Sequence, residues 1–168
     1  MLKKAKIVVH CGLKAIKMAK FTVKKLNKFL LFKLPSAYFS GIRVTAISDK
    51  EAMATVKHQW INQNPFRSLY WATQGMASEL VTGILVMKKV YESGKKISIL
   101  VTEQRGSFTK KATGKITFIC KDGHKIQAII DKAISSGEGQ TIVMKAEGFN
   151  EAFESVSNFE YTWSIKIK

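Results

Sequence analysis

The sequence predicts an α+β fold in which a curved antiparallel sheet wraps around one long apolar helix. Three observations lead to this prediction. A helix-like run extends from residue 68 to about 91 and is almost free of charge over residues 68–87. It follows a predicted β-hairpin, and strand-like runs dominate the chain after it. A chain of 168 residues is long enough for one domain with a substantial core, and no internal repeat or low-complexity segment interrupts it.

The long helix is the most informative segment. Asn64-Pro65 predicts a polar turn, and Ser68 is the expected N-cap of a helix that runs to about Tyr91. Over residues 68–87 the only charged side chain is Glu79. The length would suit a membrane span, but the polar side chains and two glycines in the run favour a buried helix of a globular domain.

The other predicted elements follow from hydrophobic periodicity. The last strand is the clearest, because its apolar and polar side chains alternate from Phe159 to Ile167. Gly106 and Gly114 are expected at bulges or turns. The predicted elements are strands at 38–47 and 52–58, a polar loop at 60–67, strands at 97–103 and 107–120, a helix from 122 to about 134, and strands at 140–149 and 159–167.

Positive charge is concentrated at the N-terminus. The net charge is +16, and no acid precedes Asp49, so ten lysines and Arg43 give +11 in the first 48 residues. Over residues 1–33, apolar side chains recur at helical spacing among the lysines, which predicts a basic amphipathic helix. The predicted domain follows it at residues 34–168. This helix can pack its apolar stripe against the sheet or lie on an anionic membrane, and the two interpretations are compatible.

Composition also bears on the class of protein. The bases are nearly all lysine, which argues against sequence-specific binding of nucleic acid, because base-edge contacts rely on Arg, Asn and Gln. Cys11 and Cys120 belong to no Cys-x-x-Cys motif or Cys/His cluster, so we expect no disulfide, metal or cofactor. The short apolar stretch at 7–13 lacks a cleavage pattern, so we expect a cytoplasmic protein, peripheral to the inner face of the membrane if the N-terminal helix binds lipid.

Glu79 is the candidate catalytic group. In a helical projection it shares a small, apolar face with Ala72, Gly75 and Thr82, and no Lys or Arg lies within a turn of it. Desolvation is expected to raise its pKa, which suits a general base near neutral pH. The alternative is a structural carboxylate that is satisfied by a neighbouring strand or by a dimer interface.

The N-terminus of the same helix is the second candidate element. Amides near Tyr70, Trp71 and Ala72 lack intrahelical acceptors, and together with the helix dipole they can hold a carbonyl or a developing oxyanion. Asn64 can orient a water or a carbonyl there, or it can serve only the Asn-Pro turn.

These residues resemble the motif of hot-dog-fold thioesterases of the phenylacetyl-CoA thioesterase type. In that family His-Gly-Gly begins six residues after the Asn of an Asn-Pro pair, and an acid follows nine residues after the His. Asn64-Pro65, Tyr70 and Glu79 keep both intervals, with Tyr70 in place of the His and Trp71-Ala72 in place of the glycines. The likeness covers about residues 34–168 and is strongest to an uncharacterised branch. The segments that resemble this branch are Leu34-Pro35 to Gly41, Ala77-Ser78-Glu79, Phe108-Thr109-Lys110-Lys111 with Gly114, and the extra helix near Asp122 to Ile134.

The resemblance implies a hot-dog fold and hydrolysis of an acyl thioester of coenzyme A or acyl carrier protein. Active sites would lie between the subunits of a homodimer or homotetramer. Glu79 would be the general base or nucleophile, Asn64 and Tyr70 would complete the catalytic group, and amides near Trp71 and Ala72 would hold the carbonyl. The acyl pocket is expected at Gly75, Ser78 and Thr82, and the coenzyme A phosphates at Arg105, Lys110 and Lys111.

Two other functions fit the same sequence. A non-catalytic binder of acyl chains or other lipids needs the apolar tunnel of such a fold but no reactive carboxylate. A basic membrane-surface or nucleic-acid-binding protein would use the N-terminal helix as its active part.

Overall fold

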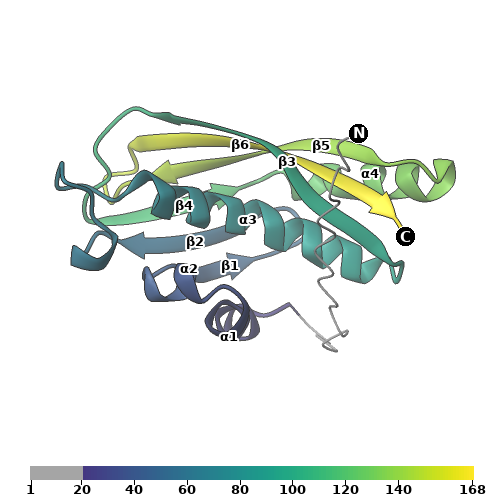
Figure 1. Ribbon diagram of the computed structural model, residues 1–168, viewed down its shortest axis with the longest axis horizontal. Coiled ribbons are helices and arrows are strands. Elements are labelled where there is room, and N and C mark those ends of the chain that lie inside the picture. Colours follow the sequence, from purple (N-terminus) through teal and green to yellow (C-terminus); the bar gives the residue numbers. More distant parts are fainter. Residues whose placement is uncertain (1–20) are drawn as a thin grey trace, which may run out of the picture.

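The computed structural model describes residues 21–168, which form a six-stranded sheet curved around one long helix (Figure 1). The strands lie in the order β1-β2-β4-β5-β6-β3, and every neighbouring pair is antiparallel. The predicted α+β class is therefore confirmed. The elements are α1 (Val23–Lys33), α2 (Pro35–Phe39), β1 (Arg43–Ile47), β2 (Ala52–Lys57), the 3₁₀ helix η1 (Trp60–Asn62), α3 (Trp71–Glu92), β3 (Ile97–Phe108), β4 (Lys115–Cys120), α4 (Gly123–Ser136), β5 (Gln140–Phe149) and β6 (Ser155–Ile167).

Helix α3 fills the concave face of the sheet because one of its sides is apolar along most of its length. Ala77, Val81 and Ile84 are fully buried on this side, and the strands contribute Phe118 and Phe159 to the same core. Full burial of one large apolar side chain stabilises a fold by about 1.5–3 kcal/mol. The helix contacts β2, β4, β5 and β6, while α4 packs beside it against β5 and β6.

The two edges of the sheet differ. At the β1 edge, the side chain of Asn27 on α1 takes the place of a neighbouring strand. Its Nδ2 donates to the Val44 carbonyl at 2.9 Å, and its Oδ1 accepts from the Val44 N–H at 2.9 Å. Leu26 and Leu30 of α1 are fully buried below this contact. At the other edge, β3 pairs with β6 on one side, and no segment within residues 21–168 pairs with its outer side.

Only part of the predicted N-terminal helix falls within the described residues. Helix α1 begins at Val23, after Thr22, whose side chain accepts a hydrogen bond from the Lys25 N–H at 3.3 Å. The helix predicted for residues 1–20 lies outside the described part of the chain. Helix α1 packs its apolar side against the sheet, and the predicted domain boundary after residue 33 stays a prediction.

The strand predicted at 38–47 is wrong in its first half. Pro35 occupies the first turn of the short helix α2, where its fixed φ favours helical geometry. Gly41 then reverses the chain at a φ of 87°, so β1 begins only at Arg43.

The predicted N-cap of the long helix is also wrong. Helix α3 begins at Trp71, and its N-cap is Tyr70, which makes no side-chain capping bond. Ser68 is instead held by Asn64, whose Oδ1 accepts from the Ser68 N–H at 3.2 Å. The hydrogen bond between Asn64 and Ser68 closes a five-residue turn before the helix, and it takes up Ser68, which would otherwise cap the helix.

The two singled-out glycines have different roles. Gly114 has a φ of 70° and forms a turn, as predicted. Gly106 is not at a bulge, because the irregularity in β3 falls between Val101 and Glu103. A Cβ at Gly106 would lie 2.9 Å from the Phe159 ring, so close packing explains this glycine.

Replacing Asn27 tests the protection of the β1 edge. Asn27→Ala leaves the donor and the acceptor of Val44 without partners, and we expect the free energy of unfolding in urea to fall by about 1–3 kcal/mol. The matched control is Lys28→Ala on the exposed side of α1, which should change it by less than about 0.5 kcal/mol. Equal effects of the two substitutions would contradict the proposed role of Asn27.

Candidate functional site

Glu79 lies on the side of α3 that its own sheet leaves half exposed. With Ala72, Gly75 and Met76 it forms a line of partly accessible residues along one helix face, which we call the Glu79 stripe. The carboxylate makes no ion pair or hydrogen bond with another side chain in residues 21–168. Burial alone raises the pKa of Glu79 above its ordinary value of 4.5, because no neighbouring charge opposes the desolvation.

The side of the helix next to the Glu79 stripe is fixed to β6 by two hydrogen bonds. The hydroxyl oxygens of Ser78 and Tyr161 lie 2.7 Å apart, and the indole Nε1 of Trp163 donates to Thr82 Oγ1 at 3.1 Å. Ser78 and Thr82 are fully buried at this contact. The structure thus places these two predicted pocket residues between helix and sheet, and only Gly75 of the predicted acyl pocket lies on the Glu79 stripe.

Two aromatic side chains of β6 border the Glu79 carboxylate. Trp163 packs so closely on the helix that a Cβ at Gly83 would be 3.2 Å from its ring and 3.7 Å from Glu79 Oε1. Burial, and to a smaller extent the Glu79 charge, raises the pKa of Tyr161 to about 12, although the Ser78 hydrogen bond acts in the other direction. Tyr161 therefore stays a neutral hydroxyl at neutral pH, and it also donates to the Gly75 carbonyl at 3.0 Å.

The N-terminus of α3 offers unpaired amides. Within residues 21–168, the N–H groups of Trp71, Ala72 and Thr73 have no acceptor, and no side chain caps them. The Tyr70 N–H is already used, because it donates to the Asn62 carbonyl at 2.8 Å. Of the three amides predicted to hold a carbonyl, the structure thus leaves those of Trp71 and Ala72 free.

A cavity of about 370 Å³ adjoins this helix end. It lies between the turn at 64–69, the first turn of α3 and the segment 108–112. Of the predicted residues, Asn64, Trp71, Lys110 and Lys111 line it. Gln74 also lines it and was missed by the sequence prediction. This side chain is 5% exposed, its Nε2 donates to the Leu69 carbonyl at 3.2 Å, and its Oε1 is buried without a partner. The sequence signal that could have identified Gln74 is its polar side chain within the apolar run of α3.

Asn64 and Tyr70 are less free than the sequence suggested. The Asn64 Oδ1 accepts from the Phe66 N–H at 3.0 Å as well as from Ser68, so this side chain shapes the turn that forms one wall of the cavity. The Tyr70 ring is exposed and contacts Trp71 edge-on, with the ring centroids 5.8 Å apart. Their catalytic roles remain predictions.

Within one chain, the carboxylate and the amides are too far apart to act on one carbonyl. Trp71 and Glu79 are eight residues apart on α3, which is ~12 Å along the helix axis. Reacting atoms must approach to about 3–3.5 Å. Within one chain, the Glu79 carboxylate and the Trp71 and Ala72 amides are therefore two separate candidate groups.

The three predicted phosphate-binding side chains are divided between two places. Lys110 and Lys111 line the cavity at the helix end, where Lys110 pairs with Glu154 at 2.6 Å and the Lys111 ammonium donates to the Phe66 carbonyl at 3.3 Å. Arg105 lies opposite Glu160 in the β3–β6 pair, away from this cavity. The structure does not bring all three together.

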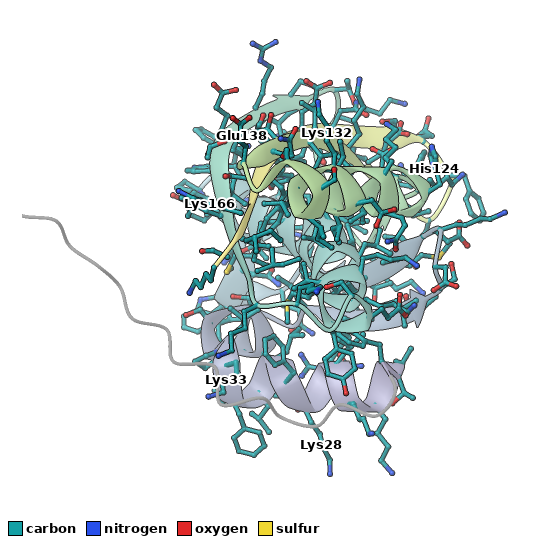
Figure 2. The ribbon with its side chains drawn as sticks, turned by 90° about the vertical axis from the view of Figure 1, so that its right-hand side faces the viewer. Lys28, Lys33, His124, Lys132, Glu138 and Lys166 are labelled. Atoms are coloured by element: carbon teal, nitrogen blue, oxygen red, sulfur yellow. The ribbon has the colours of Figure 1, made fainter. Side chains whose placement is uncertain are left out.

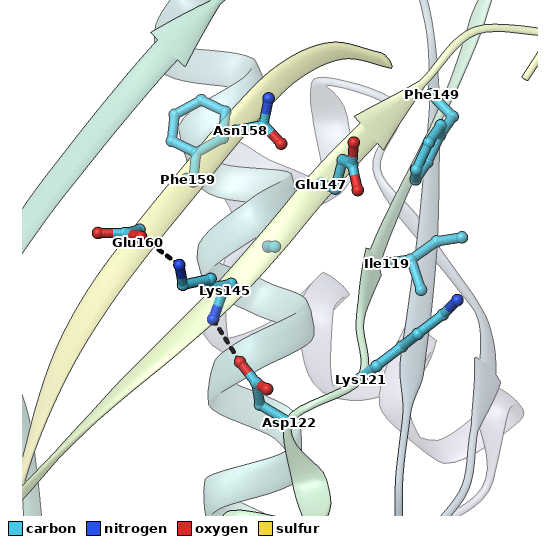
Figure 3. A pocket seen from close by; sticks show the side chains of 10 residues that line it. Ile119, Lys121, Asp122, Lys145, Glu147, Phe149, Asn158, Phe159 and Glu160 are labelled. Carbon is cyan, nitrogen blue, oxygen red and sulfur yellow. Dashed lines mark hydrogen bonds and ion pairs between the residues drawn. The ribbon is translucent and has the colours of Figure 1, made fainter. Parts of the chain in front are cut away.

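A second hollow, of about 380 Å³, lies on the face of the sheet away from α3 (Figure 3). Its charges are largely paired, since Lys145 Nζ lies 2.8 Å from Glu160 and the Lys145 N–H donates to Asp122 Oδ2 at 2.8 Å. None of the predicted site residues lines it.

Residues 21–168 contain no group of three or more His, Cys, Asp and Glu side chains arranged to hold a metal ion. In the same range, no helix combines the length and the apolar character required to cross a bilayer.

The architecture is that of a hot-dog fold, and comparison with solved structures supports this assignment. A Pseudomonas aeruginosa protein described as a probable thioesterase of unknown function is 18% identical, with 86% of this chain and 96% of that chain covered and a TM-score of 0.74. A thioesterase of Haemophilus influenzae is 16% identical over 88% of this chain and 92% of its own, with a TM-score of 0.65. A Chlorobaculum tepidum protein of unknown function is 20% identical over 87% and 94%, with a TM-score of 0.76. The predicted hot-dog fold is confirmed.

The chain belongs to the family described as a domain of unknown function, DUF4442, whose model matches residues 23–165. No curated protein sequence matches the chain. The family match begins within α1, before the predicted domain start at residue 34.

The isolated charge of Glu79 should make stability depend on pH. Because the folded-state pKa is raised, the folded form is favoured most below about pH 4.5, and this advantage is lost as the pH rises through the folded pKa. We therefore expect Glu79→Gln to be at least as stable as wild type at pH 7 in urea unfolding, with the difference disappearing towards pH 4. A variant that is clearly less stable at pH 7 would show that the carboxylate has a favourable partner. Glu138→Gln, on an exposed turn, is the control.

Proposed function

We propose that this protein hydrolyses acyl thioesters, with acyl-CoA as the first candidate substrate and acyl carrier protein as the alternative carrier. The observation that carries the proposal is the partly buried Glu79 carboxylate, which has no partner within residues 21–168, on the same helix as the Trp71 and Ala72 amides, which have no acceptor in that range. The hot-dog fold and its likeness to thioesterase structures support the same reaction class. The buried Cys120, whose pKa burial raises to about 12, is an unreactive thiol and fits the predicted cytoplasmic setting.

The separation of the two half-sites argues for catalysis between two subunits. Gly75 is midway between Trp71 and Glu79, and a Cβ built at Gly75 meets nothing within 4 Å. If two α3 helices cross antiparallel at Gly75, the Glu79 of each subunit comes beside the helix N-terminus of its partner. The missing side chain permits a close approach of the helices, and the two-fold symmetry generates two equal sites.

The open edge of β3 fits the same arrangement. This strand carries the exposed side chains of Leu100 and Phe108. An unpaired, partly apolar edge strand favours pairing with another strand, and an identical β3 related by a two-fold axis would pair with it in antiparallel fashion. A continuous sheet across the dimer would support both helices on one platform.

In the proposed reaction, Glu79 removes a proton from a water molecule as the water oxygen attacks the thioester carbonyl carbon. The carbonyl oxygen gains negative charge and is held by the amides near Trp71 and Ala72 of the other subunit. The carbon–sulfur bond then breaks, and the thiol leaves with the proton from Glu79. In direct attack, the carboxylate would bond to the carbonyl carbon as the carbon–sulfur bond breaks and the thiolate leaves, giving an acyl-enzyme anhydride. Water would then hydrolyse the anhydride to the free acid and the Glu79 carboxylate, and the same residues would serve this route.

The remaining site residues are assigned supporting roles. Gly75 would line the acyl pocket directly, while Ser78 and Thr82 would shape it through their bonds to Tyr161 and Trp163. Lys110 and Lys111 lie at the cavity beside the helix end, where a coenzyme A phosphate or the pantetheine arm could pass. Arg105 would reach a phosphate only from the opposite face of β3.

One observation favours non-catalytic binding of acyl chains as a second candidate. The first residue of α3 is Trp71, with a half-exposed indole at the place where the resembled thioesterases have glycine. A large ring there restricts the approach of a carbonyl to the amides, while the apolar cleft remains. A binder and an enzyme would differ in thiol release but not in affinity.

Thiol release from short, long and aromatic acyl-CoAs tests the assignment of Glu79. We expect Glu79→Gln to lower kcat by about 10²- to 10⁴-fold, the usual contribution of a positioned general base, while Glu138→Gln retains wild-type activity. The acidic limb of the kcat/KM profile should have its midpoint above 4.5, because the carboxylate must be ionised to accept the proton. Full activity of Glu79→Gln would remove Glu79 from the mechanism, and binding without thiol release by wild type would favour the acyl-chain binder.

Mixed dimers test whether the site is shared. Ala72→Pro removes one amide in the first helical turn, where proline is tolerated, and Glu79→Gln removes the base. Each variant alone should be inactive. A refolded one-to-one mixture should recover about a quarter of wild-type activity, since half of the dimers then hold one intact site. A mixture without recovered activity would place both groups in one subunit's site or exclude the dimer.

A further inference from the structure

Three linked elements carry exposed apolar side chains: α1 contacts α2, and η1 is hydrogen-bonded to the end of α2. Phe32, Phe39, Trp60 and Ile61 are between 58% and 83% exposed, and we call these four residues the aromatic patch. An isolated exposed aromatic residue needs no explanation, but several on adjoining elements mark a surface that binds something.

The elements that carry the patch are held together firmly. Helices α1 and α2 follow one another in the chain and are in contact. The buried side chain of Asn62 in η1 donates to the Ser40 carbonyl at the end of α2, and to the Lys57 carbonyl, both at 2.9 Å. Trp60 and Ile61 are therefore fixed beside the end of α2 that carries Phe39. Figure 1 shows α1 and α2 together below β1.

The same surface is strongly basic. Lys24, Lys25, Lys28 and Lys33 are exposed on α1, and none of them forms an ion pair within residues 21–168. The sequence has no acid before Asp49 that could neutralise them. In Figure 2, Lys28 and Lys33 lie at one end of the molecule, while Lys132 and Glu138 lie at the other.

We propose that the α1–α2–η1 surface docks the protein on anionic lipid membranes. Aromatic side chains at the level of the headgroups, flanked by lysines that face anionic lipid, form the typical composition of an interfacial anchor. Each well-placed lysine contributes roughly fivefold to the affinity for an anionic surface. Helix α1 covers the β1 edge, which is the opposite side of the sheet from the free β3 edge, so this surface stays accessible in the proposed dimer.

Co-sedimentation of the full chain with vesicles tests the proposal. Wild type should bind phosphatidylcholine vesicles that contain phosphatidylglycerol at least tenfold more tightly than pure phosphatidylcholine vesicles, and added salt should weaken the binding. Phe39→Ser combined with Trp60→Ser should lower the affinity at least tenfold. The control for the lost aromatic area is Phe153→Ser. Phe153 is 88% exposed and lies outside the α1–α2–η1 surface, so this substitution should leave the affinity for the vesicles unchanged.

The charge contribution is tested separately. Lys24→Gln, Lys25→Gln and Lys28→Gln together should weaken binding at least tenfold. The control replaces Lys115, Lys132 and Lys166 by Gln, which removes the same charge at exposed positions outside the surface. This control should lower the affinity for the vesicles less than threefold. Circular dichroism should show all variants folded, because every substituted side chain is exposed.

Three results would overturn the proposal. Equal binding to neutral and anionic vesicles, or none to either, would exclude an anionic membrane as the occupant. Unchanged binding after the Phe39 and Trp60 substitutions would assign binding to another part of the chain. A change of oligomeric state in those variants, without vesicle binding by wild type, would show instead that the patch contacts a second copy of the chain.

Discussion

Helix α3 is fixed to strand β6 by the Ser78–Tyr161 and Thr82–Trp163 hydrogen bonds, and the rest of the site depends on this attachment. The bonds set the rotation of the helix about its own axis. With Ser78 and Thr82 turned towards the sheet, the Glu79 stripe has to face the half-exposed side. Buried hydroxyl and indole groups must find partners, and another rotation would leave the Tyr161 hydroxyl and the Trp163 indole N–H without theirs.

The apolar packing of α3 explains how a partly buried Glu79 carboxylate persists in the fold. Within residues 21–168 no cation offsets the desolvation of Glu79, so its pKa is raised and the folded state opposes its ionisation. The apolar packing of α3 against the strands outweighs this cost, because many large side chains are buried on the other side of the helix. A local cost of this kind, sustained by the surrounding fold, is typical of functional sites.

The sheet separates the two proposed functions in space. Its β1 edge is closed by Asn27 and carries α1, α2 and the basic aromatic surface beside them. Its β3 edge is open and lies next to the exposed side of α3. Association of two subunits at one edge and contact with lipid at the other would therefore not compete. A chain that brings a hydrolytic site to a membrane surface would meet amphiphilic acyl thioesters where they concentrate.

The amino-acid sequence by itself determined the features that depend on local pattern. The long apolar helix, the isolated charge of Glu79, the alternating last strand and the helix after Asp122 follow from the spacing of residues close in the chain. The α+β class follows from their order, and the motif intervals indicated the hot-dog fold.

Only the tertiary structure decided the features that depend on distant contacts. The roles of Ser78 and Thr82 are set by hydrogen bonds to residues more than eighty positions away. The buried Gln74 lines a cavity that exists only in the folded chain, so its place in the site could not be predicted from nearby residues. Two interactions also compete for Ser68, the turn with Asn64 and the cap of the helix. Because the Ser68 N–H donates to Asn64 Oδ1, Ser68 belongs to the turn, and α3 begins only at Trp71. Small polar residues fit either side of an apolar helix, so their spacing alone cannot tell which side faces the sheet.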